Sequence, residues 1–202
     1  MLFGLVPAAG ESSRMGRSKL ALPLGSGTVL GWVIDALRQG GVDRVVVVVG
    51  PHVAELTPLV TLAQADVCVL VEKTKDMRAT VQHGLQWAET HYGAAVGDRW
   101  LLAPADQPKL RPPVVRRLIQ AGVGNPRFSI LVPTYNGRRG HPALIDWKHA
   151  AGIRDLAPGQ GIDAYFRQHA GETLEVPIDS PTILDDLDTP EDYERLRQSW
   201  TD

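Results

Sequence analysis

The stretch that decides the fold reads LFGLV over residues 2–6, followed by PAAGESSRMGRSK over residues 7–19. The first part is too uniformly apolar to alternate, which predicts a strand buried on both faces. The second part holds small residues, hydroxyls and several cations directly after that strand. A buried strand that ends in such a loop is typical of an α/β protein, in which ligands bind beyond the carboxyl ends of the strands.

The same rhythm continues along the chain. Apolar, branched runs predict four further strands, over residues 45–49, 67–71, 100–103 and 130–133. Helical patterns lie between or after them, over residues 29–39, 53–65, 80–90 and 113–121. This alternation predicts a three-layer, doubly wound and mainly parallel sheet with a Rossmann-like arrangement.

The last third of the chain is mixed. The Asn136-Gly137 pair predicts a tight hairpin, with a second strand over 140–145. A helix over 162–169 and a strand over 173–178 follow, and Thr189 and Pro190 predict the start of a last helix. We find no internal repeat or linker, so we expect a single domain over residues 1–202.

Composition narrows the class of protein. The 202 residues are 44% hydrophobic and 22% charged, with a formal net charge of −2, which does not favour nucleic acid as a partner. No apolar run is long enough for a membrane helix, and the apolar start lacks the marks of a signal peptide. The single Cys68 cannot form an internal disulfide. We therefore expect a cytoplasmic protein without a membrane partner.

The loop over 7–19 has the parts of a phosphate site. Glycine and alanine allow backbone amides to approach anionic oxygens, and Ser12 and Ser13 add donors. Arg14 and Lys19 can offset the charge of a triphosphate. A P-loop is excluded, because five residues rather than four separate Gly10 from Gly16. A solvated basic loop is the alternative on composition alone.

An aspartate follows the fourth predicted strand, in the sequence LLAPADQP over 101–108. Asp106 therefore lies where the fold places ligands, and its hard carboxylate oxygens suit Mg²⁺. The alternative is that Asp106 only caps a turn before Pro108. No HExxH spacing or paired cysteines indicate zinc.

The ordered motif over residues 7–19 resembles the signature of the MobA-like nucleotidyltransferases, a family that includes the molybdenum cofactor guanylyl- and cytidylyltransferases. It has Ala-Ala-Gly, a serine-bearing turn, Arg-Met-Gly and then Lys. This resemblance implies catalytic roles for Arg14, Lys19 and Asp106. It also implies nucleotide contacts from Ala8, Ala9, Gly10, Ser12, Ser13, Arg14 and Lys19.

The resemblance extends to other segments. The family has an acid before Thr-Pro in a stretch like DDLDTPED over 185–192, which makes Asp188 the expected second metal ligand, ahead of Asp186. Met77 and Thr80 match a segment that lies against the base, although Thr80 could equally cap its own helix. Gly140-His141-Pro142 resembles a turn that faces the acceptor, with an ordinary hairpin end as the alternative.

The resemblance implies that the protein transfers CMP from MgCTP to a phosphorylated acceptor and releases pyrophosphate. The acceptor that it favours is molybdenum cofactor (molybdopterin). Ala9 favours CTP, because guanylyl members tend to have glycine there. Pro7 resembles instead the cytidylyltransferases of isoprenoid synthesis. The alternatives are GTP as donor, an isoprenoid or sugar phosphate as acceptor, and a non-catalytic cofactor insertion chaperone. A molybdoenzyme is the expected receiver of the product.

Overall fold

The computed structural model describes residues 1–10, 18–53 and 55–201. Its centre is an eight-stranded sheet in the order β10-β7-β9-β6-β1-β4-β5, with β8 paired to β7. The strands β1, β4, β5, β6, β7 and β10 are parallel, whereas β8 and β9 are antiparallel to their neighbours. The strand bounds are β1 Leu2–Ala8, β4 Arg44–Val49, β5 Asp66–Val69, β6 Arg99–Leu102, β7 Ile130–Tyr135, β8 Arg138–Arg139, β9 Ala143–Asp146 and β10 Thr173–Pro177.

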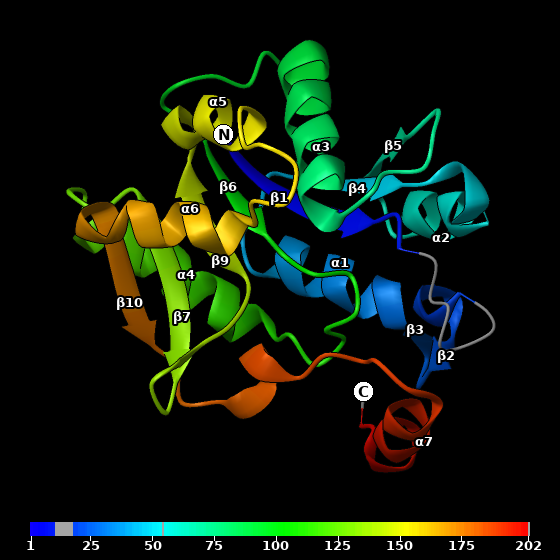
Figure 1. The fold of residues 1–202 in the computed structure, drawn as a ribbon. Helices are drawn as coiled ribbons and strands as arrows, with labels where there is room; N and C mark the ends of the chain where they lie inside the picture. The colour runs from blue at the N-terminus through cyan, green and yellow to red at the C-terminus, as the bar shows by residue number, and fades with distance from the viewer. Residues whose placement is uncertain (11–17, 54, 202) are drawn as a thin grey trace.

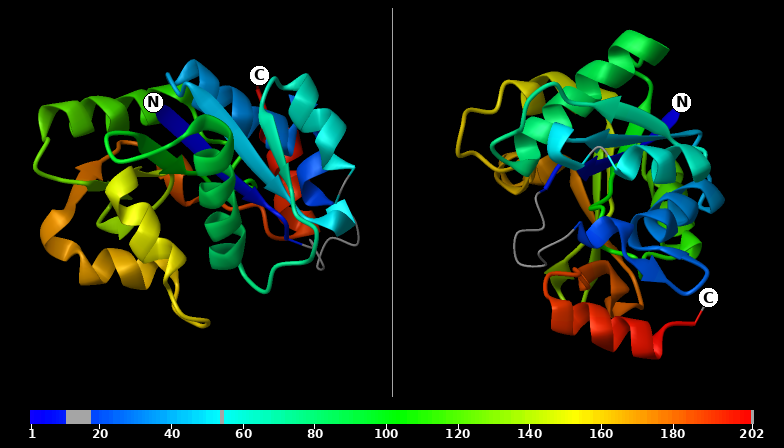
Figure 2. Two further views of the ribbon diagram at one scale, coloured as in Figure 1. Left: turned by 90° about the horizontal axis from the view of Figure 1, so that it is seen from above. Right: turned by 90° about the vertical axis from the view of Figure 1, so that its right-hand side faces the viewer.

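Helices cover both faces of this sheet (Figure 1). α3, α5 and α6 lie on one face and α1 and α4 on the other, as the turned views also show (Figure 2). A small hairpin, β2 Pro23–Leu24 and β3 Gly27–Thr28, leads into α1. The helix bounds are α1 Val29–Gln39, α2 Leu56–Leu62, α3 Met77–Tyr92, α4 Pro112–Gly124, α5 Ala150–Arg154, α6 Ile162–Gln168 and α7 Pro190–Ser199.

Two hydrophobic cores lie on opposite faces of the sheet. In β4, Val45, Val47 and Val49 belong to the core shared with α1, α2 and α4. Val46 and Val48 of the same strand belong to the core shared with α3, α5 and α6. Every residue of this run after Arg44 is therefore buried, which is why the run shows no alternation. The predicted three-layer, mainly parallel α/β fold is confirmed.

Most predicted elements appear, with shifts at their ends. α1 has the predicted bounds, and Asn136 and Gly137 form the hairpin turn with φ of 49° and 75°. α2 is shorter than predicted. α3 begins at Met77, three residues earlier than predicted, because the side chain of Asp76 accepts a hydrogen bond from the Ala79 amide. Capping by Thr80 is therefore wrong.

The last helix packs against the start of the chain. Thr189 and Asp192 form a capping box at the start of α7, and the Tyr193 hydroxyl donates to the carbonyl of Pro23 at 2.6 Å. Tyr193 and Leu196 enter the same core as α1. No helix in the described part of the chain has the length and hydropathy of a membrane span.

Candidate functional site

A cavity of about 530 Å³ opens at the carboxyl ends of β1 and β6, beside the start of α3. Such a volume can hold a small organic ligand. Its walls come from five stretches of the chain that the fold brings together at the carboxyl edge of the sheet, as expected for an α/β fold. The lining residues are Pro7 to Gly10, Lys19, Leu20, Lys73 to Met77, Thr80, Pro104 to Asp106, and Asp188.

The ammonium group of Lys19 contacts several oxygen atoms at this cavity. It donates to Oδ2 of Asp106 at 2.6 Å and to the carbonyl oxygen of Leu187 at 2.6 Å. Oδ1 of Asp188 lies 3.5 Å from the same nitrogen. The Lys19 and Asp106 side chains are only 14% and 25% exposed, so water screens this pair less than a surface pair. One cation thus joins two carboxylates.

The acidic segment before α7, residues 185–188, forms hydrogen bonds and an ion pair with the loop that carries Asp106. The amide of Leu187 donates to the carbonyl of Asp106 at 2.9 Å. The Gln107 amide group donates to Asp186 at 2.8 Å, and the Lys109 ammonium to Asp185 at 3.0 Å. Asp188 is then the acid of this segment that lines the cavity, within the described part of the chain.

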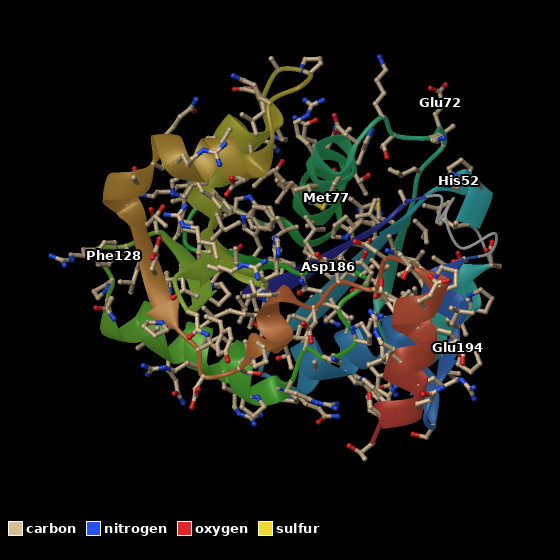
Figure 3. All side chains as sticks on the ribbon, turned by 60° about the horizontal axis from the view of Figure 1, so that its bottom comes forward. His52, Glu72, Met77, Phe128, Asp186 and Glu194 are labelled. Atoms are coloured by element: carbon tan, nitrogen blue, oxygen red, sulfur yellow. The ribbon has the colours of Figure 1, made fainter. Side chains whose placement is uncertain are left out.

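The structure brings together most of the residues predicted for the site. Ala8, Ala9, Gly10, Lys19, Met77, Thr80, Asp106 and Asp188 all line the cavity. Ser12, Ser13 and Arg14 lie outside the described residues. Figure 3 labels Met77 at the start of α3 and Asp186 in the segment that leads to α7. The roles given to these residues remain predictions.

α3 is held close to the sheet at a glycine. A Cβ placed on Gly84 would lie 2.5 Å from Leu5 Cδ1 and 2.7 Å from Val48 Cγ2. At the start of the helix, the Ala79 amide and then the Arg78 guanidinium hold the pKa of Asp76 below its usual range, against partial desolvation. The close packing and the charged cap fix the wall formed by Met77 and Thr80.

Sequence reasoning missed part of one wall. Lys73, Thr74 and Lys75 line the cavity on the segment between β5 and α3. Their position could have been predicted, because a loop that follows a parallel strand lies at the ligand edge of the sheet. Two lysines there add positive charge to the cavity wall.

His141 lies near the acids of the site, beside a cis peptide bond to Pro142. Burial lowers the pKa of His141, while Asp186, Asp106 and Asp163 oppose that shift. The net shift favours the neutral form of the imidazole. The predicted turn over 140–142 does not line the cavity described above, and its role toward an acceptor remains a prediction.

The described residues fit a divalent cation whose remaining coordination positions are filled by atoms of a bound ligand. No group of three or more His, Cys, Asp or Glu side chains forms a metal site within residues 1–10, 18–53 and 55–201. Asp106 and Asp188, however, both approach one ammonium, which shows that a cation between them is electrostatically favoured. Mg²⁺ commonly takes one or two carboxylates together with phosphate oxygens and water.

The fold and this cavity define an α/β protein with charged side chains around a ligand-sized cavity at the carboxyl edge of its sheet. Residues 4–173 match the family model of the MobA-like NTP transferase domain. The chain belongs to this family, and it is a nucleotidyltransferase by that membership.

Similar proteins cover almost the whole chain. The purine catabolism protein PucB of Bacillus subtilis is 29% identical, over 99% of this chain and 98% of its own length. The molybdenum cofactor cytidylyltransferase of Escherichia coli is 24% identical, over 98% and 96%. The crystal structure of Rv0371C of Mycobacterium tuberculosis in complex with manganese is 29% identical with a TM-score of 0.74, over 98% of this chain and 99% of that chain.

Proposed function

We propose that this protein transfers CMP from MgCTP to a phosphorylated acceptor and releases pyrophosphate. The acceptor that we favour is molybdenum cofactor. The observation that carries the proposal is the convergence of Lys19, Asp106 and Asp188 at one cavity. A cation next to two carboxylates is what a nucleoside triphosphate and its metal require.

In the proposed reaction, an acceptor phosphate oxygen attacks the α-phosphorus of CTP. A new P–O bond forms, the bond from the α-phosphorus to the bridging oxygen breaks, and pyrophosphate leaves with the electron pair. Lys19 and Arg14 offset the charge on the reacting and leaving oxygens, and backbone groups of Ala8 to Gly10 hold the phosphates. Asp106 and Asp188 would hold Mg²⁺, which supplies further charge neutralisation when bound.

The choice of CTP is supported by Ala9 and by one relative. Ala9 lines the cavity, and a methyl group at this position would leave less room for a purine base than a glycine. The Escherichia coli relative is named a molybdenum cofactor cytidylyltransferase. We expect the chain to work in the cytoplasm, with a molybdoenzyme as receiver of the product.

We also propose that residues 1–202 act as a single domain. The family model ends at residue 173, yet Leu187, Tyr193 and Leu196 beyond it pack into the core shared with α1. Asp188, a proposed metal ligand, lies in that same C-terminal segment. Removing the segment would therefore remove part of the site.

The test is a pyrophosphate-release assay with each of the four triphosphates, Mg²⁺ and each candidate acceptor, followed by mass spectrometry of the products. Release that depends on CTP and molybdenum cofactor supports the proposal. Turnover with GTP would show that GTP, not CTP, is the donor. Turnover with an isoprenoid or sugar phosphate would show that this compound, not molybdenum cofactor, is the acceptor. Stable binding of CTP and of a molybdoenzyme without any product would favour an insertion chaperone.

A further inference from the structure

Two threonine hydroxyls form a short chain on one wall of the cavity. Thr74 Oγ1 and Thr80 Oγ1 are 2.7 Å apart, and Thr80 Oγ1 lies 3.2 Å from the carbonyl oxygen of Asp76. Both threonines line the cavity; Thr80 is 3% exposed and Thr74 is half-buried. These two hydrogen bonds thus connect a backbone carbonyl to the cavity.

The direction of the protons in this chain follows from the carbonyl. A carbonyl oxygen can only accept, so Thr80 donates its single hydroxyl proton to Asp76. This bond to a residue four positions earlier is a common one for threonine in helices. While Thr80 keeps that bond it has no proton left to give, so in this arrangement Thr74 donates its own proton to Thr80. Thr74 Oγ1 is left with lone pairs only.

The carbonyl at the end of this chain is fixed in place. The Asp76 carboxylate accepts from the Ala79 amide at 2.8 Å and from Arg78 at 3.3 Å. Arg78 also donates to the carbonyl of Leu156 at 2.5 Å, which ties this turn to a second segment. The first turn of α3 therefore holds the hydroxyl chain in one orientation before any ligand binds.

We infer that Thr74 selects a nucleobase with an exocyclic amino group, by presenting a fixed hydrogen-bond acceptor. Cytosine and uracil have the same ring size and differ at C4, where cytosine has an amino donor and uracil a carbonyl acceptor. An oxygen that can only accept forms a hydrogen bond with the first and opposes the second. The inference rests on the proposed function, since it takes the base of the triphosphate to lie on this wall.

The first test compares CTP with UTP in the pyrophosphate-release assay, using the wild-type protein, Thr74→Val and Thr74→Ser. Valine keeps the shape of threonine without the oxygen, and serine keeps the oxygen. We expect Thr74→Val to lower the ratio of kcat/KM for CTP over UTP by about tenfold, the effect of one hydrogen bond, and Thr74→Ser to keep most of it. An unchanged ratio in a Thr74→Val protein that unfolds at the wild-type temperature would overturn the inference.

The second test uses Thr80→Val, which removes the group that fixes the proton of Thr74. The Thr74 hydroxyl can then rotate and donate to the uracil oxygen. We expect kcat/KM for UTP to rise relative to that for CTP, so that the ratio of CTP over UTP falls, whatever the change in kcat/KM for CTP alone. A ratio that stays at the wild-type value would overturn the inference.

Failure of the proposed function can be told apart from failure of this inference. If the wild-type protein releases no pyrophosphate from any triphosphate, the proposed reaction is wrong. The same variants are then compared by calorimetric titration with CTP and UTP in the presence of Mg²⁺. A wild-type preference for CTP that Thr74→Val removes would still support the inference, and equal affinities or no binding would overturn it.

Discussion

Lys19 and Asp106 form an ion pair at 2.6 Å although 87 positions separate them in the sequence. The pair joins the end of the loop after β1 to the loop after β6, and Asp188 adds a second carboxylate to the same ammonium. A divalent cation and the lysine would use the same oxygens. The arrangement therefore predicts opposite effects of this lysine on metal binding and on turnover.

Replacing Lys19 by Met should lower kcat/KM for CTP by about 100-fold or more, a loss of about 3 kcal/mol for one preorganised charge. The same variant should bind Mn²⁺ more tightly in the absence of nucleotide, since two carboxylates lose their competing cation. Pyrophosphate release and Mn²⁺ titration measure the two effects. Lys109→Met is the matched control, because Lys109 pairs with Asp185 away from the cavity. Equal effects of both variants would contradict the role of Lys19.

Asp106→Asn should raise the Mg²⁺ concentration needed for half-maximal activity, and Asp188→Asn should do so too, because each removes an anionic oxygen from the proposed ion. Asp186→Asn serves as the control, since an asparagine oxygen can still accept the hydrogen bond from Gln107. Activity measured against Mg²⁺ concentration checks this. A shift with Asp186→Asn as large as with Asp106→Asn would argue against the assignment.

Arg14→Ala should cost about 3 kcal/mol in transition-state stabilisation, if Arg14 is the main cation near the developing charge. The measurement is kcat for pyrophosphate release at saturating CTP, with the unfolding temperature as a check on the fold. Turnover equal to that of the wild-type protein would refute the role of Arg14.

Gly84→Ala should destabilise the protein by about 1–3 kcal/mol, the usual cost of overpacking, because the added methyl group would meet Leu5 and Val48. The control is Gly124→Ala, at a glycine of α4 with open space around its Cβ position, where a change within about 0.5 kcal/mol is expected. Urea unfolding measures both free energies. Similar losses for the two variants would mean that α3 does not pack this closely on the sheet.

The free energy of unfolding should fall as the pH drops below about 6.5. Burial lowers the pKa of His149 below its ordinary value of 6.5, with Glu172 opposing the shift. Below 6.5 the unfolded chain binds this proton more readily than the folded one, so stability is complete above 6.5 and declines toward the lower folded pKa. Urea unfolding between pH 7 and pH 5 should show a smaller decline for His149→Gln. The pKa of His141 is lowered too, so some decline should remain in this variant.

A second pH effect is expected at lower pH from Glu172. Hydrogen bonds from Lys148 and then Ser129 lower its pKa from 4.5 to about 2, so its contribution to stability is present above 4.5 and is lost toward 2.

Identical pH profiles of wild-type and His149→Gln proteins between pH 7 and pH 5 would count against His149 as a source of the decline below about 6.5.

Local sequence by itself determined much of this protein. The uniformly apolar run over 45–49 predicts a strand buried on both faces, because only a sheet covered on both sides can bury every residue of a strand. Asn136-Gly137 and Thr189-Pro190 fix a turn and a helix start through backbone preferences that need no distant partner. The loop over 7–19 identified the family through its order of residues.

Only the tertiary structure decided which of these residues meet. The antiparallel insertion of β9 between β6 and β7 depends on pairing between segments far apart in sequence. Asp188 lies near the Lys19 ammonium, whereas the neighbouring Asp186 accepts from Gln107, 79 positions away in the sequence. The contact between the Thr74 and Thr80 hydroxyls depends on where α3 begins, and the sequence-based prediction placed that start three residues too late. Local patterns encode backbone preference, whereas these contacts are set by packing across the sheet.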